Sequence, residues 1–330
     1  MSTPQTTASR LPVIIDTDVD IDDWMAMLFL LKHPEVDVLG ITTTGTGAAH
    51  LTPGTLNALK LLMLVDQPTL PVARGANAPL RYSNVFPTSI RSVIDSVYGL
   101  PLPTNPNGPS AQDAVSFLRT TLLGSPTPVS ILAIGGLTNL GILLRDHPEV
   151  APRIARIVVM GGAVNVPGNV NVVDPDYANK TAEWNIFLDP LGADIVFRSG
   201  VPITLVPLDA SNHVPLDMNF YVRLQDRHDT RAAAFVFQAL TADMPFVNSG
   251  DFYFWDPLAA AALVAPSLVT TQQMGIRVVQ ELNEEEDHSG QLLQDDTRGS
   301  RMSVAMGANA DAFYELFLSI LNLPDGKTLA

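Results

Sequence analysis

The sequence predicts an α/β protein with a largely parallel, mixed central sheet flanked by helices. Three observations carry this prediction. Apolar runs rich in β-branched residues recur along the chain, and stretches with helical periodicity separate them. An acidic cluster follows the first run, where a strand would end and a helix begin. Strands that alternate with helices form a mainly parallel sheet that helices cover on both faces.

The predicted elements follow one another in a regular order. The first strand, Leu11–Ile15, is dominated by β-branched residues, and the helix after it runs from Trp24 to His33, where Pro34 stops it. The later strands are expected at Val36–Thr43, Val129–Ile134, Ile157–Met160 and Ile203–Val206. The helices between them are expected at Leu56–Val65, Ala111–Leu123, Leu137–Arg145 and Leu191–Arg198.

Two segments do not fit the alternation. Residues 80–110 are rich in Pro, Asn, Ser and Tyr, so we expect a long loop or lid there. Residues 281–300 carry Glu284, Glu285, Glu286 and Asp287 and are expected to form a solvated acidic turn. No repeat and no break in composition divides the chain, so residues 1–330 are expected to form a single domain.

Composition narrows the function. A chain of 330 residues with 46% hydrophobic content can bury a large core. Its net charge of −15 argues against binding to nucleic acid polymers or anionic membranes and favours a small neutral or cationic ligand. The absence of cysteine excludes disulfides, thiolate metal sites and cysteine nucleophiles. The N-terminus lacks a signal-peptide pattern and no long apolar run occurs, so a cytoplasmic location is expected.

The acidic cluster Asp16–Asp23 places five carboxylates within eight residues. Ligands of open α/β sheets bind at the carboxyl ends of strands, and the positive end of a helix dipole tolerates acidic groups there. Five carboxylates still repel one another, and a hard cation such as Ca²⁺ or Mg²⁺ would relieve this. The alternative is simple helix capping. An EF-hand is excluded because Ile21 and Met27 stand at its Gly and Glu positions, and Asp20 disfavours an aspartyl-phosphatase loop.

Other groups of residues carry hydrogen-bonding or aromatic side chains near predicted strand ends. Asn169, Glu183 and Asn185 suit the hydroxyls of a ligand, with capping of helices and turns as the alternative. Gly135–Asn139 is a glycine turn that can direct a backbone carbonyl towards a ligand. The aromatic run Phe252–Trp255 precedes Asp256, which could complete a metal site, although aromatic residues usually belong to the core.

The histidines are weak candidates for catalysis. His33 ends a predicted helix, His147 precedes a proline and His288 lies in the acidic turn, so we expect all three at the surface. His213, near a strand end, is the only one with a position suited to a site.

Taken together, these segments resemble the nucleoside hydrolase family, the inosine-uridine preferring N-ribohydrolases. The resemblance covers residues 13 to 265 and rests on motifs that stand in the family's order. These motifs are Asp16–Asp23, Pro71–Gly75 with Pro79–Leu80, Gly135–Asn139, Met160–Gly162, Ala182–Asn185 and Trp255–Pro257. The resemblance implies a Rossmann-like nucleoside hydrolase fold, a nucleoside as the substrate, and a homodimer or homotetramer.

The resemblance also implies a role for each site residue. It implies a Ca²⁺ held by Asp18, Asp23, the backbone carbonyl of Ile134 and Asp256, together with a water and the ribose 2′- and 3′-hydroxyls. Asp18 would be the general base on that water, which attacks the anomeric carbon opposite the base with inversion. The ribose and the base would be bound by Asp22, Met160, Asn169, Glu183, Trp184, Asn185 and Trp255. Asp16 and Asp20 would support the loop.

Two departures from the family pattern bear on substrate choice. Trp255 stands where many members carry a histidine that can protonate the leaving base, so this chain resembles the purine-preferring subgroup, in which an indole stacks on the purine. Tyr82, Phe86 or Tyr98 would be the second stacking partner. A family asparagine near Gly47 is missing.

Three alternatives stay open. The chain could be a hydrolase of pyrimidine or modified nucleosides, or a protein that binds nucleosides without turnover. A Mg²⁺-dependent phosphatase is disfavoured because no Lys or Arg is positioned near the acidic loop in the sequence.

Overall fold

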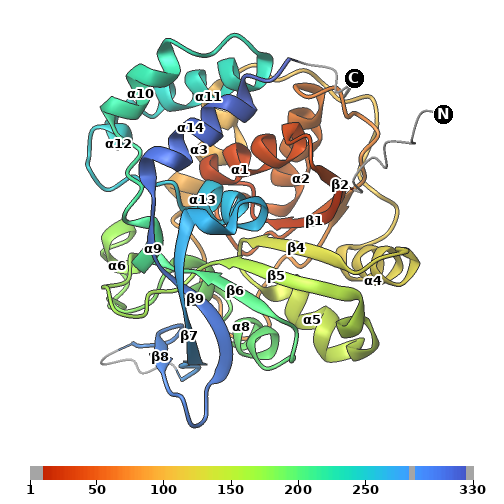
Figure 1. Ribbon diagram of the computed structural model, residues 1–330, viewed down its shortest axis with the longest axis vertical. Coiled ribbons are helices and arrows are strands. Elements are labelled where there is room, and N and C mark those ends of the chain that lie inside the picture. Colours follow the sequence, from red (N-terminus) through yellow and green to blue (C-terminus); the bar gives the residue numbers. More distant parts are fainter. Residues whose placement is uncertain (1–9, 282–286, 325–330) are drawn as a thin grey trace, which may run out of the picture.

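The computed structural model describes residues 10–281 and 287–324, which are built around one sheet with the strand order β3-β2-β1-β4-β5-β6-β9-β7-β8 (Figure 1). Strands β1 to β6 and β9 are parallel to one another, whereas β7 pairs antiparallel with β9 on one side and with β8 on the other. The strands are β1 Leu11–Thr17, β2 Val36–Thr43, β3 Val72–Arg74, β4 Val129–Ile134, β5 Ile154–Met160, β6 Ile203–Val206, β7 Val269–Val278, β8 Leu292–Gln294 and β9 Ser300–Ala308. The predicted fold class, a largely parallel mixed sheet, is confirmed.

Helices cover both faces of the sheet (Figure 1). The helices are α1 Ile21–Lys32, α2 Leu51–Met63, α3 Thr88–Asp95, α4 Ala114–Gly124, α5 Thr138–Asp146, α6 Val170–Val173, α7 Trp184–Leu188, α8 Pro190–Phe197, α9 Leu208–Ser211, α10 Met218–Gln225, α11 Arg231–Ala242, α12 Met244–Val247, α13 Trp255–Val264 and α14 Ala310–Leu321. Short 3₁₀ turns occur at η1 Val97–Gly99, η2 Pro148–Arg153 and η3 Pro266–Leu268. One apolar core lies beneath α1, α2, α13 and α14, and a second lies beneath α4, α5 and α8.

The strand order positions the site. From β1 the chain moves outward through β2 to β3, whereas β4, β5 and β6 lie on the other side of β1. The order therefore reverses between β1 and β4, whose last residues Thr17 and Ile134 are partners in the sheet. In sheets of this kind the crevice at such a switch point binds the ligand.

Five of the strands stand where the sequence predicted them, with β1 and β5 each longer by two or three residues. The C-terminal strands β7 to β9 were not predicted. Residues 80–110 are also not one long loop, because α3 and η1 interrupt them. The expected acidic turn at 281–300 is wrong in part, since it contains β8 with a buried Leu292, while Glu284, Glu285 and Glu286 lie outside the described residues. His33 is buried at the end of α1 rather than exposed.

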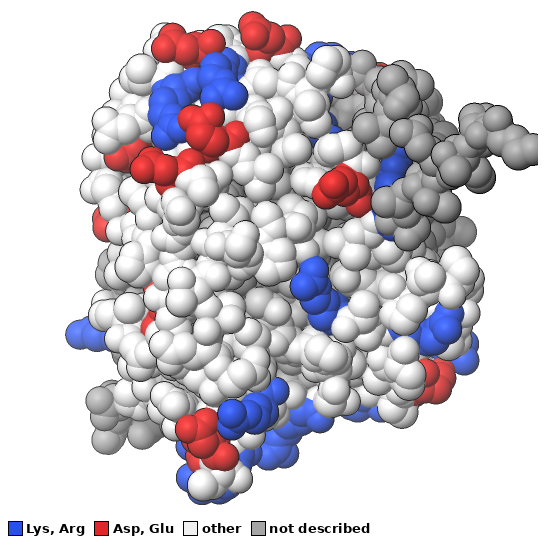
Figure 2. Space-filling view, viewed as in Figure 1, with Lys and Arg blue, Asp and Glu red and all other residues white. Residues whose placement is uncertain are grey.

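Charged side chains are unevenly distributed over the surface. Figure 2 shows them gathered over α10 and α14 and at the β7–β9 end, with little charge across the middle of this face. Arg223 and Arg227 both pair with Glu315 between α10 and α14. No helix in the described part of the chain is both long and apolar enough to cross a membrane.

Candidate active site

A cavity of about 590 Å³ opens at the carboxyl ends of β1, β4 and β5. Every residue that the sequence analysis proposed for the site lines this cavity: Asp18, Asp22, Asp23, Ile134, Met160, Asn169, Glu183, Trp184, Asn185, Trp255 and Asp256. The fold therefore brings together motifs that lie far apart in the sequence. His213, by contrast, is exposed and does not line the cavity.

The acidic loop between β1 and α1 has a tightly held backbone. Val19 has a φ of 66°, in the left-handed region, which a β-branched residue rarely adopts. Two hydrogen bonds hold it there: its amide donates to Thr17 Oγ1 at 3.0 Å, and the Trp24 indole Nε1 donates to its carbonyl at 2.7 Å. Backbone strain of this kind is often found at functional sites. Here it turns the chain between Asp18 and the start of α1.

Asp18 is supported from the loop that follows β2. The backbone amide of Ala48 donates to Asp18 Oδ2 at 2.8 Å. Gly47 lies so close that a Cβ on it would stand 1.7 Å from the same oxygen, so only glycine fits there. A backbone amide thus supports the carboxylate in the loop where the expected asparagine is missing.

Three carboxylates converge beside Asp18. Oxygens of Asp22, Asp23 and Asp256 lie within 4.8 Å of one another, and all three residues are buried. Asp23 is fixed by the Thr17 hydroxyl and by the Asp20 amide, which donates to it at 3.0 Å in a capping box. Asp256, in the first turn of α13, has a buried Oδ1 without a hydrogen-bond partner among the described residues. Such an arrangement can hold a cation.

Burial shifts the acidities of these groups. It raises the pKa of Asp22 to about 7, with the charge of Asp18 adding to the effect. It also holds the pKa values of Asp23 and Asp256 well above the usual range, with the neighbouring carboxylates contributing. Clustered, buried carboxylates are costly when ionised. The site as it stands therefore favours protons or a cation.

The two remaining acids of the cluster have supporting contacts. Asp16, fully buried in β1, accepts hydrogen bonds from the Thr42 hydroxyl at 2.5 Å and from the Asn139 amide at 2.8 Å. Asp20 is the N-cap of α1 and accepts from the Ile21 amide at 2.6 Å. Both bonding patterns fit the structural role expected for these residues.

Hydrogen-bonding side chains form the second wall of the cavity. Glu183 caps α7 by accepting from the Asn185 amide at 2.9 Å, and it also accepts from the Gly162 amide at 2.8 Å. Burial raises its pKa to about 7. Asn185 donates to the carbonyl of Met160 at 3.3 Å, and Asn169 accepts from the Trp184 amide at 3.1 Å. Helix capping was the alternative to ligand binding for these residues. Glu183 does cap a helix, and it also lines the cavity.

Aromatic rings make the third wall. Trp184 stacks on Phe86, with their ring centroids 4.1 Å apart. Trp255 lies near Phe246, at 6.2 Å between centroids. The indole Nε1 atoms of both tryptophans are buried and have no partner among the described residues, so each can donate to a ligand. Of the loop aromatics considered, Phe86 and Tyr98 line the cavity, whereas the Tyr82 hydroxyl donates to the carbonyl of Gln280.

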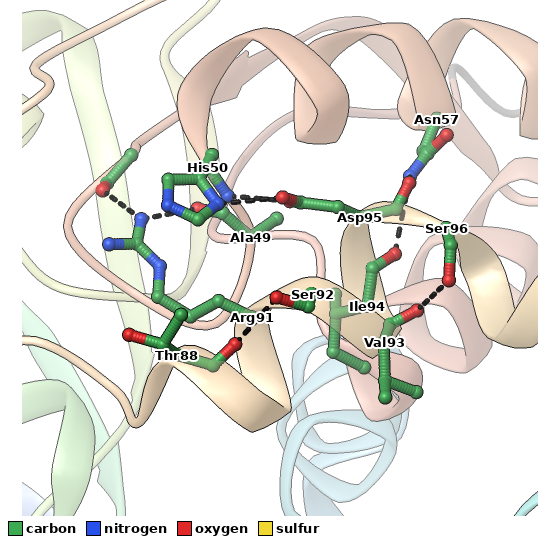
Figure 3. Close-up of polar contacts among 11 residues, drawn as sticks. Ala49, His50, Asn57, Thr88, Arg91, Ser92, Val93, Ile94, Asp95 and Ser96 are labelled. Carbon is green, nitrogen blue, oxygen red and sulfur yellow. Dashed lines mark hydrogen bonds and ion pairs between the residues drawn. The ribbon is translucent and has the colours of Figure 1, made fainter.

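Sequence reasoning missed the contribution of α3. Ile90, Val93 and Ile94 follow helical spacing and line the cavity, but the surrounding Pro, Asn and Ser residues masked this signal. Arg91 from the same helix donates through Nη2 to the carbonyls of Gly45 at 2.8 Å and Ala49 at 3.1 Å (Figure 3). Among the described residues no Arg or Lys lines the cavity, although the charge of Arg91 lowers the pKa of Asp18 against the larger effect of burial.

The fold is an α/β fold with a cavity at the switch point of its sheet. The cavity contains three clustered carboxylates that can hold a cation, together with hydrogen-bonding and aromatic side chains. The model of the inosine-uridine preferring nucleoside hydrolase family matches residues 13–315. The chain belongs to this family of hydrolases, which act on nucleosides.

Some proteins similar to this chain are named for a pyrimidine specificity and others for a purine preference. The pyrimidine-specific ribonucleoside hydrolase RihA of Citrobacter koseri is 34% identical over 280 residues, which are 81% of this chain and 84% of that protein. The plant nucleoside hydrolase PpNRh1 has a TM-score of 0.83 and 28% identity, covering 95% of this chain and 99% of its own. The purine-preferring ribonucleoside hydrolase from Gardnerella vaginalis has a TM-score of 0.78 and 28% identity, covering 94% and 98%.

Proposed function

We propose that this protein hydrolyses the N-glycosidic bond of ribonucleosides with the help of Ca²⁺, releases the free base and ribose, and prefers purine nucleosides. The observation that carries the proposal is the convergence of Asp22, Asp23 and Asp256 in the same cavity as Glu183 and Asn185. Clustered carboxylates beside groups that can bind hydroxyls suit a ribose whose N-glycosidic bond is to be hydrolysed.

The donor set fits a hard cation. Carboxylate oxygens are the ligands that Ca²⁺ prefers, and the unpartnered Oδ1 of Asp256 supplies one that nothing else uses among the described residues. Asp18, Asp23, Asp256 and the backbone carbonyl of Ile134 would hold the ion. When bound, Ca²⁺ would lower the pKa of a water and orient the ribose hydroxyls.

The protein groups have separate tasks in this proposal. Asp18, held by the Ala48 amide, accepts the proton of the attacking water. Asp22 binds a ribose hydroxyl, and Glu183, Asn169, Asn185 and the Met160 carbonyl hold the rest of the sugar in the shape that favours an oxocarbenium-like transition state. Trp184 Nε1 is a further donor on this side of the cavity.

Trp255 supports the purine preference. Its ring lines the cavity beside Phe246, and a purine offers a larger face for stacking than a pyrimidine does. Stacking on the indole would also ease protonation of the leaving purine at N7. A specific observation favours a second candidate, a pyrimidine-preferring hydrolase: RihA of Citrobacter koseri, 34% identical, is named pyrimidine-specific.

A nucleoside panel assayed for reducing sugar, with Ca²⁺ and with a chelator, tests the proposal. We expect ribose from inosine, adenosine and guanosine, a higher kcat/KM for inosine than for uridine, and loss of activity with chelator. A clear preference for uridine would replace the first candidate with the second. Tight nucleoside binding by calorimetry without any product would instead identify a non-catalytic binding protein.

The same proposal includes a cytoplasmic location and a homodimer or homotetramer that folds as one domain. Gel filtration with light scattering measures the oligomeric state.

A further inference from the structure

Tyr98 occupies a strained position in the cavity wall. It follows α3 in the turn η1, and both Val97 and Tyr98 have positive φ angles, 52° and 53°. Two successive non-glycine residues in the left-handed region are energetically unfavourable. Such a conformation persists only where surrounding contacts impose it. The contacts of this turn therefore indicate which side-chain position the unfavourable backbone conformation serves.

The residues just before Tyr98 are fixed to the body of the protein (Figure 3). The Asn57 side chain in α2 donates to the carbonyl of Asp95 at 3.0 Å. The Asp95 carboxylate lies 2.6 Å from His50 Nδ1 and accepts from the His50 backbone amide at 2.9 Å. The Trp24 ring then packs against the Tyr98 ring edge to face, at 6.3 Å between centroids. These contacts fix the direction of the Tyr98 side chain.

The Tyr98 hydroxyl is hydrogen-bonded to the carboxylate of Asp243, which makes no capping hydrogen bond to α12. It donates to Asp243 Oδ2 at 2.7 Å. Burial, with nearby carboxylates adding to the effect, raises the pKa of Tyr98 far above its usual value, so the phenol keeps its proton and acts as the donor. Asp243 stands at the N-cap position of α12 but makes no side-chain cap there. Both residues line the cavity.

We infer that Asp243, oriented by Tyr98, reads the nucleobase and selects bases that carry an exocyclic amino group in place of a carbonyl oxygen. The inference rests on the proposed function and adds the chemical class of its substrate. The phenol engages Oδ2 and Asp243 lines the cavity, so Oδ1 is the oxygen that we expect to accept a hydrogen bond from the base. An amino group donates to a carboxylate in a charge-assisted bond, whereas a carbonyl in the same place meets another acceptor.

Two pairs of nucleosides isolate this effect, because the members of each pair carry an amino group or an oxygen at the same ring position. The pairs are adenosine with inosine and cytidine with uridine. We expect kcat/KM to favour the amino member of each pair by about 10- to 100-fold, as hydrogen bonds to charged groups do. Purine or pyrimidine preference cancels within a pair.

Substitutions assign the discrimination to the two residues. Asp243→Asn offers an amide that can donate to a carbonyl, so the amino preference should vanish or reverse in both pairs. Tyr98→Phe removes the orienting hydroxyl and should lower the amino-to-oxo ratio several-fold. The ratio is the readout because a merely structural defect lowers both members of a pair alike. Asp226→Asn, an exposed carboxylate outside the cavity, controls for the loss of one charge.

The outcomes separate the inference from the proposed function. Equal kcat/KM values within both pairs, or ratios that neither Asp243→Asn nor Tyr98→Phe changes, overturn the inference while hydrolysis itself stands. If no nucleoside is hydrolysed, the proposed function fails, and dissociation constants for the same four nucleosides, measured by calorimetry on wild type and Asp243→Asn, decide the inference by the same ratio.

Discussion

At the scale of single residues, the acidic loop divides its carboxylates by their neighbours. Asp16 Oδ1 accepts from the Thr42 hydroxyl and the Asn139 amide, and Asp20 accepts from the Ile21 amide as the N-cap of α1. Asp18 has the Ala48 amide on one oxygen and lines the cavity. Val19, whose backbone is in the left-handed region, lies between Asp18 and Asp20. Carboxylates that are two residues apart thus differ in function because the backbone turns between them.

The contact between Gly47 and Asp18 gives a first prediction. In Gly47→Ala the new Cβ would stand 1.7 Å from Asp18 Oδ2, so the carboxylate must move. A displacement of this size should lower kcat by about 100-fold, with folding retained. Gly124→Ala is the control, because a Cβ there meets nothing within 4 Å at the end of α4. Equal kcat in both variants would show that the position of Asp18 does not limit the reaction.

The buried acids give a second prediction for the metal-free protein. Burial raises the pKa of Glu183 to about 7 and that of Asp16 to about 6, so the folded state holds protons that the unfolded state has released. Stability should therefore fall as the pH rises from about 4.5 to 7, by up to roughly 1.4 kcal/mol per unit for each group.

Urea unfolding in chelator at several pH values measures this slope. Glu183→Gln should make it shallower, whereas Glu149→Gln, at an exposed glutamate, should leave it unchanged. A slope of the opposite sign in the wild type would contradict the assignment of these buried acids.

At the scale of elements, α3 shows where prediction from sequence fails. The buried strands Val36–Thr43 and Val129–Ile134 were predicted to the residue, since long apolar runs specify strands within a parallel sheet. Helix α3 has only eight residues, and its apolar side both lines the cavity and packs on the first core. The site motifs were recognisable because each lies at a strand end or at the start of a helix. Tyr98 was named only as one of three candidate stacking partners, and Arg91 and Asp243 were assigned no place, since only tertiary contacts bring them there.

Arg91 gives a third prediction, on how α3 is held. In Arg91→Gln the carbonyls of Gly45 and Ala49 lose their shared donor, and the protein should lose about 1–3 kcal/mol of stability. Because the same loop supports Asp18, kcat should fall as well. Urea unfolding and initial rates measure both effects. Arg119→Gln, which breaks an ion pair whose partners are both 46% exposed, should cost under about 1 kcal/mol and leave the rate intact.

At the scale of the whole molecule, the carboxylate centre joins two distant parts of the chain. Asp22 and Asp23 begin α1, and Asp256 begins α13, which packs against α1 on the same face of the sheet. Without a cation, these acids oppose the packing of the two helices by charge repulsion. With one, they hold the helices together. The cation site is therefore also a determinant of global stability.

A fourth prediction follows for the melting temperature. Calcium at 100 times its Kd should stabilise the wild type by about 2.7 kcal/mol. In Asp256→Asn this calcium effect should largely disappear, while the metal-free variant at pH 8 should melt no lower than the metal-free wild type, because one repelling charge is gone. Asp226→Asn should keep the full calcium effect. A wild-type melting temperature that calcium does not change would contradict the proposed site.

The place of β9 in the sheet has a consequence for the order in which the nascent protein can fold. Among the described strands β9 comes last in the sequence, yet it lies between β6 and β7 and pairs with both. Until β9 has been synthesised, β7 can pair with β8 but has no link to β6, although β1 to β6 can already pair with one another. The edge of β6 is then open to other chains, and it closes only when β9 has left the exit tunnel.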